Sequence, residues 1–155
     1  MKIRSLLMTT VLFALGACAS TPPPRDALYH QFGGREGLEA LVDTLLYRVS
    51  DDPRIAHHFV DVNIINLNDR LVEFLCVQSG GPCTYAGKDM AEAHKHVKIA
   101  EADFNALVED LMWAMDERKV PRTAQNQLLR RLAAMQRDIV RRGNAPVAPS
   151  PLRRP

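Results

Sequence analysis

Residues 80–99 read GGPCTYAGKDMAEAHKHVKI, a Gly- and Pro-rich turn followed by a short amphipathic segment with a histidine at position 94. Glycine and proline favour turns, so the helix before this stretch is expected to end at Gly80. Met90 and His94 are four residues apart and share one face of a short helix, which we predict over residues 90–96. His96 points elsewhere on that helix. The stretch therefore predicts one histidine on a very short helix between two longer ones.

The rest of the chain is predicted to be helical, because apolar residues recur at intervals of three and four. Almost no segment alternates with a period of two, which argues against a sheet. The predicted helices cover residues 27–32, 35–50 and 52–59, a helix capped by Asn66 or Asn68 that ends at Gly80, residues 90–96, residues 104–115, and one long final helix that ends at Val140. Such a set of helices, with a histidine on the shortest, suits a globin-like packing.

The N-terminus has the composition of a secretory signal. Lys2 and Arg4 precede an apolar run over residues 5–17, which is too short to span a membrane. A basic start followed by an apolar centre is typical of a signal peptide. The run ends in Leu-Gly-Ala-Cys at residues 15–18, which resembles a bacterial lipobox and implies cleavage before Cys18 with acylation of its sulfur. An ordinary cleaved signal with a chance cysteine is the alternative.

Acylation of Cys18 would attach the protein to a membrane, because several acyl chains give a durable anchor. Ala19 follows the cysteine in place of an aspartate, and this lipoprotein pattern predicts a cell-envelope protein at the outer membrane, facing the periplasm. Cleavage of the signal would remove Lys2 and Arg4 from the 20 basic residues, so the mature chain would carry 18 basic and 18 acidic residues. This neutral balance predicts no nucleic-acid partner.

Several motifs, in their order along the chain, resemble those of the group 1 truncated haemoglobins, small bacterial and protozoan globins. These motifs are the Gly33-Gly34 pair after an aromatic residue, Phe59, the Gly80-Gly81-Pro82 turn, Tyr85-Ala86-Gly87, Met90 four residues before His94, and Ile99 before a helix that carries a phenylalanine. The resemblance covers residues 28–140. It implies an all-α fold of the truncated globin type, a two-over-two helical sandwich with a reduced first helix.

The resemblance and the composition of the termini together divide the chain into four parts. We expect a signal peptide with a lipobox over residues 1–17, a Pro-rich tether over 18–26, a truncated globin domain over 27–142, and a disordered Pro/Arg tail over 143–155.

In this family a histidine holds the iron of a haem, so the resemblance implies that His94 is the proximal ligand of a haem b. The chain has no Cys-x-x-Cys-His motif, and non-covalent attachment is therefore expected. The second ring nitrogen should donate to a carbonyl or a water, which fixes the tautomer. The residues implied to line the haem pocket are Leu46, Tyr47, Phe59, Leu67, Leu71, Leu75, Tyr85, Met90 and Ile99.

The distal side departs from the family pattern. Many members place a tyrosine and a glutamine where an ungapped match puts Leu46 and Leu71. Tyr47 comes one residue later, about 100° further round the helix. A hydrogen-bond donor favours O₂ as a ligand by about 1 kcal/mol, whereas CO and NO need it less. The resemblance therefore implies modest O₂ affinity and fast autoxidation, unless Tyr47 turns inward.

His57 and His58 end the short third segment. Histidines at a helix end are mostly surface residues, which is our expectation for both. A role for one of them as an internal sixth iron ligand is the alternative.

Cys76 and Cys83 flank the Gly-Gly-Pro turn, and they are the two cysteines that remain when Cys18 is acylated. In an oxidising envelope compartment we predict that they form a disulfide. Two separate thiols, with Cys76 buried and Cys83 exposed, are the alternative.

The sequence thus predicts a haem-binding globin that reversibly binds O₂ or another diatomic gas, NO or CO, and whose electron donor is unknown. A haem enzyme of NO-detoxifying or peroxidase type at the same iron is the first alternative, so whether the protein is an enzyme stays open. A haem-free helical envelope lipoprotein is the second alternative. A Soret band in the purified protein would separate this last hypothesis from the two haem hypotheses.

Overall fold

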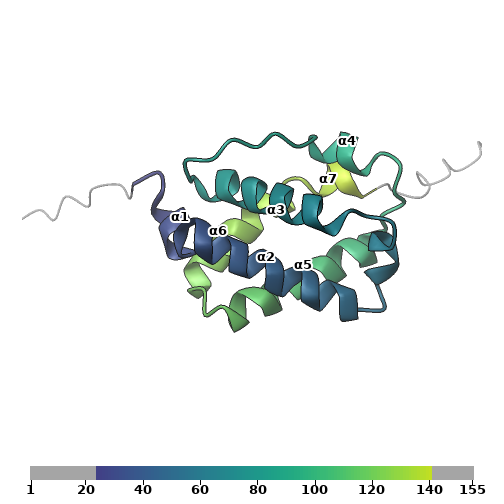
Figure 1. The fold of residues 1–155 in the computed structure, drawn as a ribbon, viewed down its shortest axis with the longest axis horizontal. Helices are drawn as coiled ribbons and strands as arrows, with labels where there is room; N and C mark the ends of the chain where they lie inside the picture. The colour runs from purple at the N-terminus through teal and green to yellow at the C-terminus, as the bar shows by residue number, and fades with distance from the viewer. Residues whose placement is uncertain (1–23, 141–155) are drawn as a thin grey trace, which may run out of the picture.

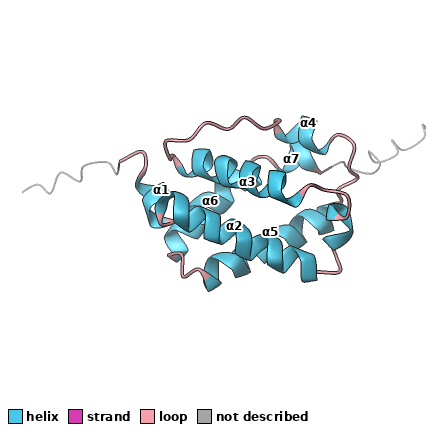
Figure 2. Ribbon diagram, in the orientation of Figure 1, coloured by secondary structure: helices cyan, strands magenta, loops and turns pink. Residues whose placement is uncertain are grey.

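The computed structural model describes residues 24–140, which form α-helices and one 3-10 helix (Figures 1 and 2). In chain order these are α1 (Ala27–Gln31), α2 (Gly34–Asp51), the 3-10 helix η1 (Ala56–Phe59), α3 (Ile64–Ser79), α4 (Met90–His94), α5 (Glu101–Glu117), α6 (Arg122–Ala133) and α7 (Gln136–Ile139). No strand occurs in this part of the chain, so the prediction of an all-α fold is confirmed. Between residues 24 and 140, no helix is both long and apolar enough to cross a membrane. The predicted signal peptide, Cys18 and the Pro/Arg tail lie outside the described residues.

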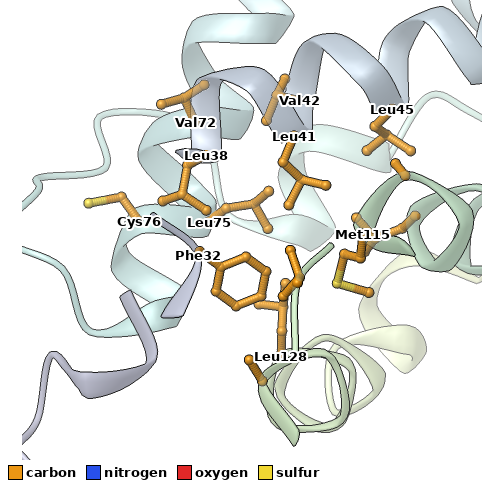
Figure 3. Packing of buried hydrophobic residues seen from close by; sticks show 14 of the residues in the cluster. Phe32, Leu38, Leu41, Val42, Leu45, Val72, Leu75, Cys76, Met115 and Leu128 are labelled. Atoms are coloured by element: carbon orange, nitrogen blue, oxygen red, sulfur yellow. The ribbon is translucent and has the colours of Figure 1, made fainter. Parts of the chain in front are cut away.

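Helix α2 is central to the core, because it packs against both α3 and α5 (Figure 1). Its inner face buries Leu38, Leu41 and Leu45 in one cluster with Leu75 of α3 and Met115 of α5 (Figure 3). Burying one leucine side chain stabilises a fold by about 1.5–3 kcal/mol. These contacts give the site a rigid scaffold of three long helices.

The turn between α1 and α2 requires glycine. Gly33 has a φ of +83° and Gly34 a φ of +67°, a region in which residues with side chains are strained. The backbone N–H of Gly33 donates to the His30 carbonyl at 3.0 Å and closes the end of α1. The glycine pair therefore lets the short first helix fold back, so that Phe32 enters the core.

The prediction that Asn66 or Asn68 caps the helix before the Gly-Gly-Pro turn is wrong. The cap is Asn63, whose side-chain oxygen accepts a hydrogen bond from the backbone N–H of Asn66 at 3.0 Å, so α3 begins at Ile64. The predicted end of this helix is confirmed, because Gly80 caps it with a φ of +83°.

The short helix with the histidine is also shorter than predicted. α4 ends at His94 and not at His96, since the backbone N–H of Val97 donates to the His94 carbonyl at 3.0 Å and turns the chain there.

One long final helix was predicted, and this prediction is wrong. α6 ends at Ala133 and α7 begins at Gln136. Between them the N–H of Met135 donates to the Leu132 carbonyl at 2.9 Å, a hydrogen bond over three residues that tightens the backbone. The break redirects the chain, and α7 packs against α4.

Buried charges fix the end of α2 against α5. Asp52, directly after α2, accepts hydrogen bonds from Nε and Nη2 of Arg54 at 2.9 and 2.7 Å, which lowers its pKa to about 2. Nη1 of Arg54 also reaches Oε2 of Glu109 on α5 at 2.6 Å. Asp110, one residue further on, accepts from Nε of Arg48 at 3.0 Å, while its burial raises its pKa. This network holds the chain just before η1.

The loop over residues 80–89 is fastened to α3 at three points. A disulfide joins Cys76, buried in α3, to Cys83 in the loop. The ring of Tyr85 packs edge-on against Phe74, with 5.5 Å between the ring centroids. The N–H of Ala86 donates to Oε2 of Glu73 at 3.3 Å. Because this loop leads into α4, its attachment to α3 sets where α4 begins.

Replacing Cys83 by serine should lower the free energy of unfolding, because the disulfide restricts the unfolded chain. For a closed loop this short, the chain-entropy model gives about 2–3 kcal/mol. Urea denaturation of the wild type and Cys83→Ser measures the difference. In the presence of a thiol reductant, which opens the bridge in the wild type, the difference should disappear. Equal unfolding free energies without reductant would contradict a stabilising bridge.

Candidate functional site

Helix α4 presents the histidine that the sequence singles out. Asp89 caps the helix, since its Oδ1 accepts from the backbone N–H of Glu92 at 2.7 Å. His94 is half-buried, and its Nδ1 lies 2.8 Å from the carbonyl oxygen of Met90, one turn earlier. A carbonyl oxygen only accepts, so Nδ1 carries the proton of the neutral ring and Nε2 keeps its lone pair. In this arrangement the hydrogen bond to a carbonyl oxygen orients the histidine and leaves its other nitrogen free to bind a metal.

Several apolar side chains on the surrounding elements are only half-buried, unlike those of the core. They are Phe59 of η1, Leu67 and Leu71 of α3, Met90 of α4, and Ile99 just before α5. Phe59 and Leu71 pack against the edge of the core. Covering such surface is favourable by about 25 cal/mol per Å². A lone imidazole nitrogen on α4 and half-buried apolar side chains on these elements fit a haem, whose iron a histidine could hold.

Two of the predicted pocket residues, Leu75 and Tyr85, pack against other parts of the chain. Leu75 is 3% exposed and lies in the closed core (Figure 3). Tyr85 packs against Phe74, and its hydroxyl donates to the Lys88 carbonyl at 2.8 Å. Leu75 thus contributes to the core, and Tyr85 contributes to the loop that leads to α4.

Leu46 and Tyr47 have opposite environments, although they are adjacent. Leu46 is half-buried and lines a small pocket of about 250 Å³ with Phe59, Ile64 and Val49. Tyr47 also lines this pocket, but 68% of the residue is exposed to solvent. Adjacent helical residues point about 100° apart, so the inward position of Leu46 leaves Tyr47 outside. The structure therefore does not turn Tyr47 inward.

The two histidines of η1 also differ. His57 is exposed, but the expectation of a surface position is wrong for His58, whose side chain is 14% exposed. Nε2 of His58 lies 3.2 Å from Oδ2 of Asp103 in α5. The contact joins residues far apart in the sequence, and no periodic pattern in the sequence predicts it. His96, the remaining histidine near the site, is exposed beyond the end of α4.

Comparison with known proteins identifies the relatives of this chain. A sequence model of the bacterial-like globin family matches residues 27–141. A group 1 truncated hemoglobin of Tetrahymena thermophila is 32% identical over 93 residues, which cover 60% of this chain and 77% of that protein. One of Synechocystis is 34% identical over 100 residues, which cover 62% of this chain and 81% of that protein. The crystal structure of the truncated hemoglobin of Tetrahymena pyriformis matches with a TM-score of 0.71 at 27% identity, over 73% of this chain and 97% of that one.

Three variants of the Tetrahymena pyriformis protein have also been solved, one with a tyrosine replaced and two with a glutamine replaced. The first glutamine follows the tyrosine by 21 residues, and the second follows the first by 4. Leu46, Leu67 and Leu71 have the same spacing in this chain.

The structural match confirms the predicted two-over-two truncated globin fold. The family match extends over most of the chain and agrees with the all-helical fold. This chain therefore belongs to the bacterial-like globin family, as a haem-binding globin of the truncated type.

Proposed function

We propose that this chain reversibly binds a diatomic gas at the iron of a non-covalent haem b, with His94 as the proximal ligand. The observation that carries the proposal is the 2.8 Å contact between Nδ1 of His94 and the Met90 carbonyl oxygen. It selects the tautomer in which Nε2 lacks a proton, which is the form that binds iron. A haem held there would supply the gas-binding chemistry, an iron that can take O₂, NO or CO.

The residues of the chain position the haem and exclude water from it. Asp89 holds the first turn of α4, and the loop over residues 80–89 fixes where that helix starts. Met90 is one turn before His94 and offers an apolar side chain on the proximal side. Phe59 and Leu71, both half-buried, offer apolar surface on the distal side. A haem that covers these side chains gains the free energy of their burial.

The distal side is proposed to be apolar. Leu46, Leu67 and Leu71 stand at the spacing of the replaced tyrosine and glutamines in the Tetrahymena pyriformis protein. A leucine side chain cannot donate a hydrogen bond, and the hydroxyl of Tyr47 lies on an exposed side chain. O₂ as a ligand benefits from a donor, whereas CO and NO depend on it less. The site therefore favours CO and NO over O₂ more than a polar distal site would.

An enzymatic role of the NO-detoxifying or peroxidase type is less well supported by these residues. Proton transfer at the distal side needs a side chain that can hold a proton near the substrate. Leu46 and Leu71 cannot do so. Reversible gas binding needs no such group, although a return from the ferric state needs an electron donor.

The purified protein, without its first 18 residues and reconstituted with haem, should show a Soret band. His94→Ala should weaken or shift that band, because the mutant lacks the nitrogen that binds iron. His96→Ala is the matched control, since it removes an exposed histidine two residues away and should leave the spectrum unchanged. Absence of a Soret band in the wild type would contradict the proposed function. A spectrum changed by His96→Ala alone would move the ligand to His96.

Replacing Leu71 by glutamine should raise the O₂ affinity about fivefold, because a buried hydrogen bond contributes about 1 kcal/mol. The CO affinity should change less. Association and dissociation rates after flash photolysis give both affinities. Tyr47→Phe is the control and should leave both gases unaffected, since the hydroxyl that it removes is on an exposed side chain. A large loss of O₂ affinity in Tyr47→Phe would show that Tyr47 reaches the ligand and that the distal side is polar.

We further propose that the protein is held in the cell envelope by acylation of Cys18, at the outer membrane and facing the periplasm. The Leu-Gly-Ala-Cys sequence at residues 15–18 supports this proposal. A disulfide between Cys76 and Cys83 is consistent with an oxidising compartment. The membrane and an electron donor in the envelope are then its proposed partners.

In a bacterial host, the full chain should incorporate labelled palmitate and sediment with the membranes. Cys18→Ser should abolish both properties, because the sulfur is the site of acylation. Cys83→Ser is the matched control, since it also replaces a cysteine by serine but within the globin domain. Equal labelling of the wild type and Cys18→Ser would refute the anchor without affecting the proposed haem site.

A further inference from the structure

His58 is a buried titratable side chain for which the proposed function gives no role. It is the third residue of η1, directly before Phe59, and its side chain is 14% exposed. Its Nε2 is enclosed and makes no aligned hydrogen bond within residues 24–140. Oδ2 of Asp103 lies 3.2 Å away, an ion-pair distance. A carboxylate beside an enclosed imidazole nitrogen offsets part of the cost of burying that nitrogen.

Asp103 is held in place by the start of α5. Its Oδ2 also accepts the backbone N–H of Ala100 at 2.9 Å, and Ala100 is the cap of that helix. This hydrogen bond is the main cause that lowers the pKa of Asp103, and His58 adds to the effect. The carboxylate therefore stays charged and stays at the point where the chain from His94 enters α5.

The contact thus connects two segments that flank the proposed haem. On one side is η1, which ends in the half-buried Phe59. On the other side is the segment over residues 95–100, which runs from His94 to the cap of α5. His57 is exposed, and its ring lies against that of His58 at a tilt of 40°, with 4.0 Å between the ring centroids.

We propose that His58 and Asp103 form a clasp that holds Phe59 and the segment after His94 at a fixed separation, so that both keep their positions against the haem. His58 is a positioning residue in this account and does not touch the iron. The proposal rests on the proposed function, in which the haem lies between Phe59 and His94. It deepens that function, because retention of the haem then depends on a side-chain pair outside the pocket residues.

The test compares the haem-loaded proteins His58→Phe, Asp103→Asn and the double variant with the wild type. Asn at position 103 keeps an oxygen for the Ala100 N–H and removes the charge. Transfer of haem to an excess of apomyoglobin gives the rate of haem loss. We expect each single change to accelerate the loss about threefold to fivefold, in the range of a partly exposed ion pair. The double variant should be no faster than the faster single variant, because the two changes remove one shared interaction.

His30→Phe is the matched control, since it breaks an exposed His–Asp pair at the start of α1, and it should lose haem at the wild-type rate. Two further measurements separate positioning from general stability. The iron–histidine stretching band of the ferrous protein should shift or broaden in His58→Phe and Asp103→Asn but not in His30→Phe. Thermal unfolding of the five apoproteins, namely the wild type, the three single variants and the double variant, shows whether the fold itself is weakened.

Wild-type rates and an unchanged stretching band in His58→Phe would overturn the clasp, even if its apoprotein melted earlier, since the contact would then be merely structural. Additive rates in the double variant would overturn it as well. Failure of the proposed function is recognised separately, because the wild type would then take up no haem, and the clasp as a haem-positioning contact would fall with it.

Discussion

The hydrogen bond between Nδ1 of His94 and the carbonyl oxygen of Met90 is the interaction on which the site depends. It decides which ring nitrogen carries the proton and so which one is available to iron. The bond spans one helical turn and exists only while α4 is folded. α4 has five residues, and a helix of that length is not stable alone in water. The surrounding structure must therefore hold it.

That support comes from segments before and after α4 in the sequence. α3 holds the loop over residues 80–89 through the Cys76–Cys83 disulfide and through the contact of Phe74 with the loop residue Tyr85. The loop ends at Asp89, which caps α4. From the C-terminal side, the break between α6 and α7 brings α7 against α4. α3 also carries Leu71, so one helix provides the proposed apolar distal surface and the attachment of the proximal loop. A change in α3 is consequently expected to affect both sides of the haem.

Much of this arrangement could be predicted from the sequence, because it depends on local patterns. Spacings of three and four residues predicted the long helices, and Gly33 and Gly80 predicted where helices end. The offset of one residue between Leu46 and Tyr47 indicated that Tyr47 points in another direction, and Tyr47 is exposed. The cap at Asn63 and the break after Ala133 could not be predicted, because several residues were equally suitable and packing decides between them. The His58–Asp103 contact could not be predicted either, since it joins two distant segments. The assignment of a haem to His94 came from the family resemblance, as the helix alone would also suit an ordinary histidine.

The most direct test of the account is chemical rescue of His94→Gly. Glycine removes the imidazole and leaves space in which a free imidazole molecule can bind. Haem titrations of this variant are followed by visible spectroscopy with and without imidazole, beside the wild type. The account predicts that the variant alone lacks the wild-type Soret spectrum and that added imidazole restores it. A wild-type spectrum of His94→Gly without imidazole would show that another residue holds the iron, and it would contradict the account.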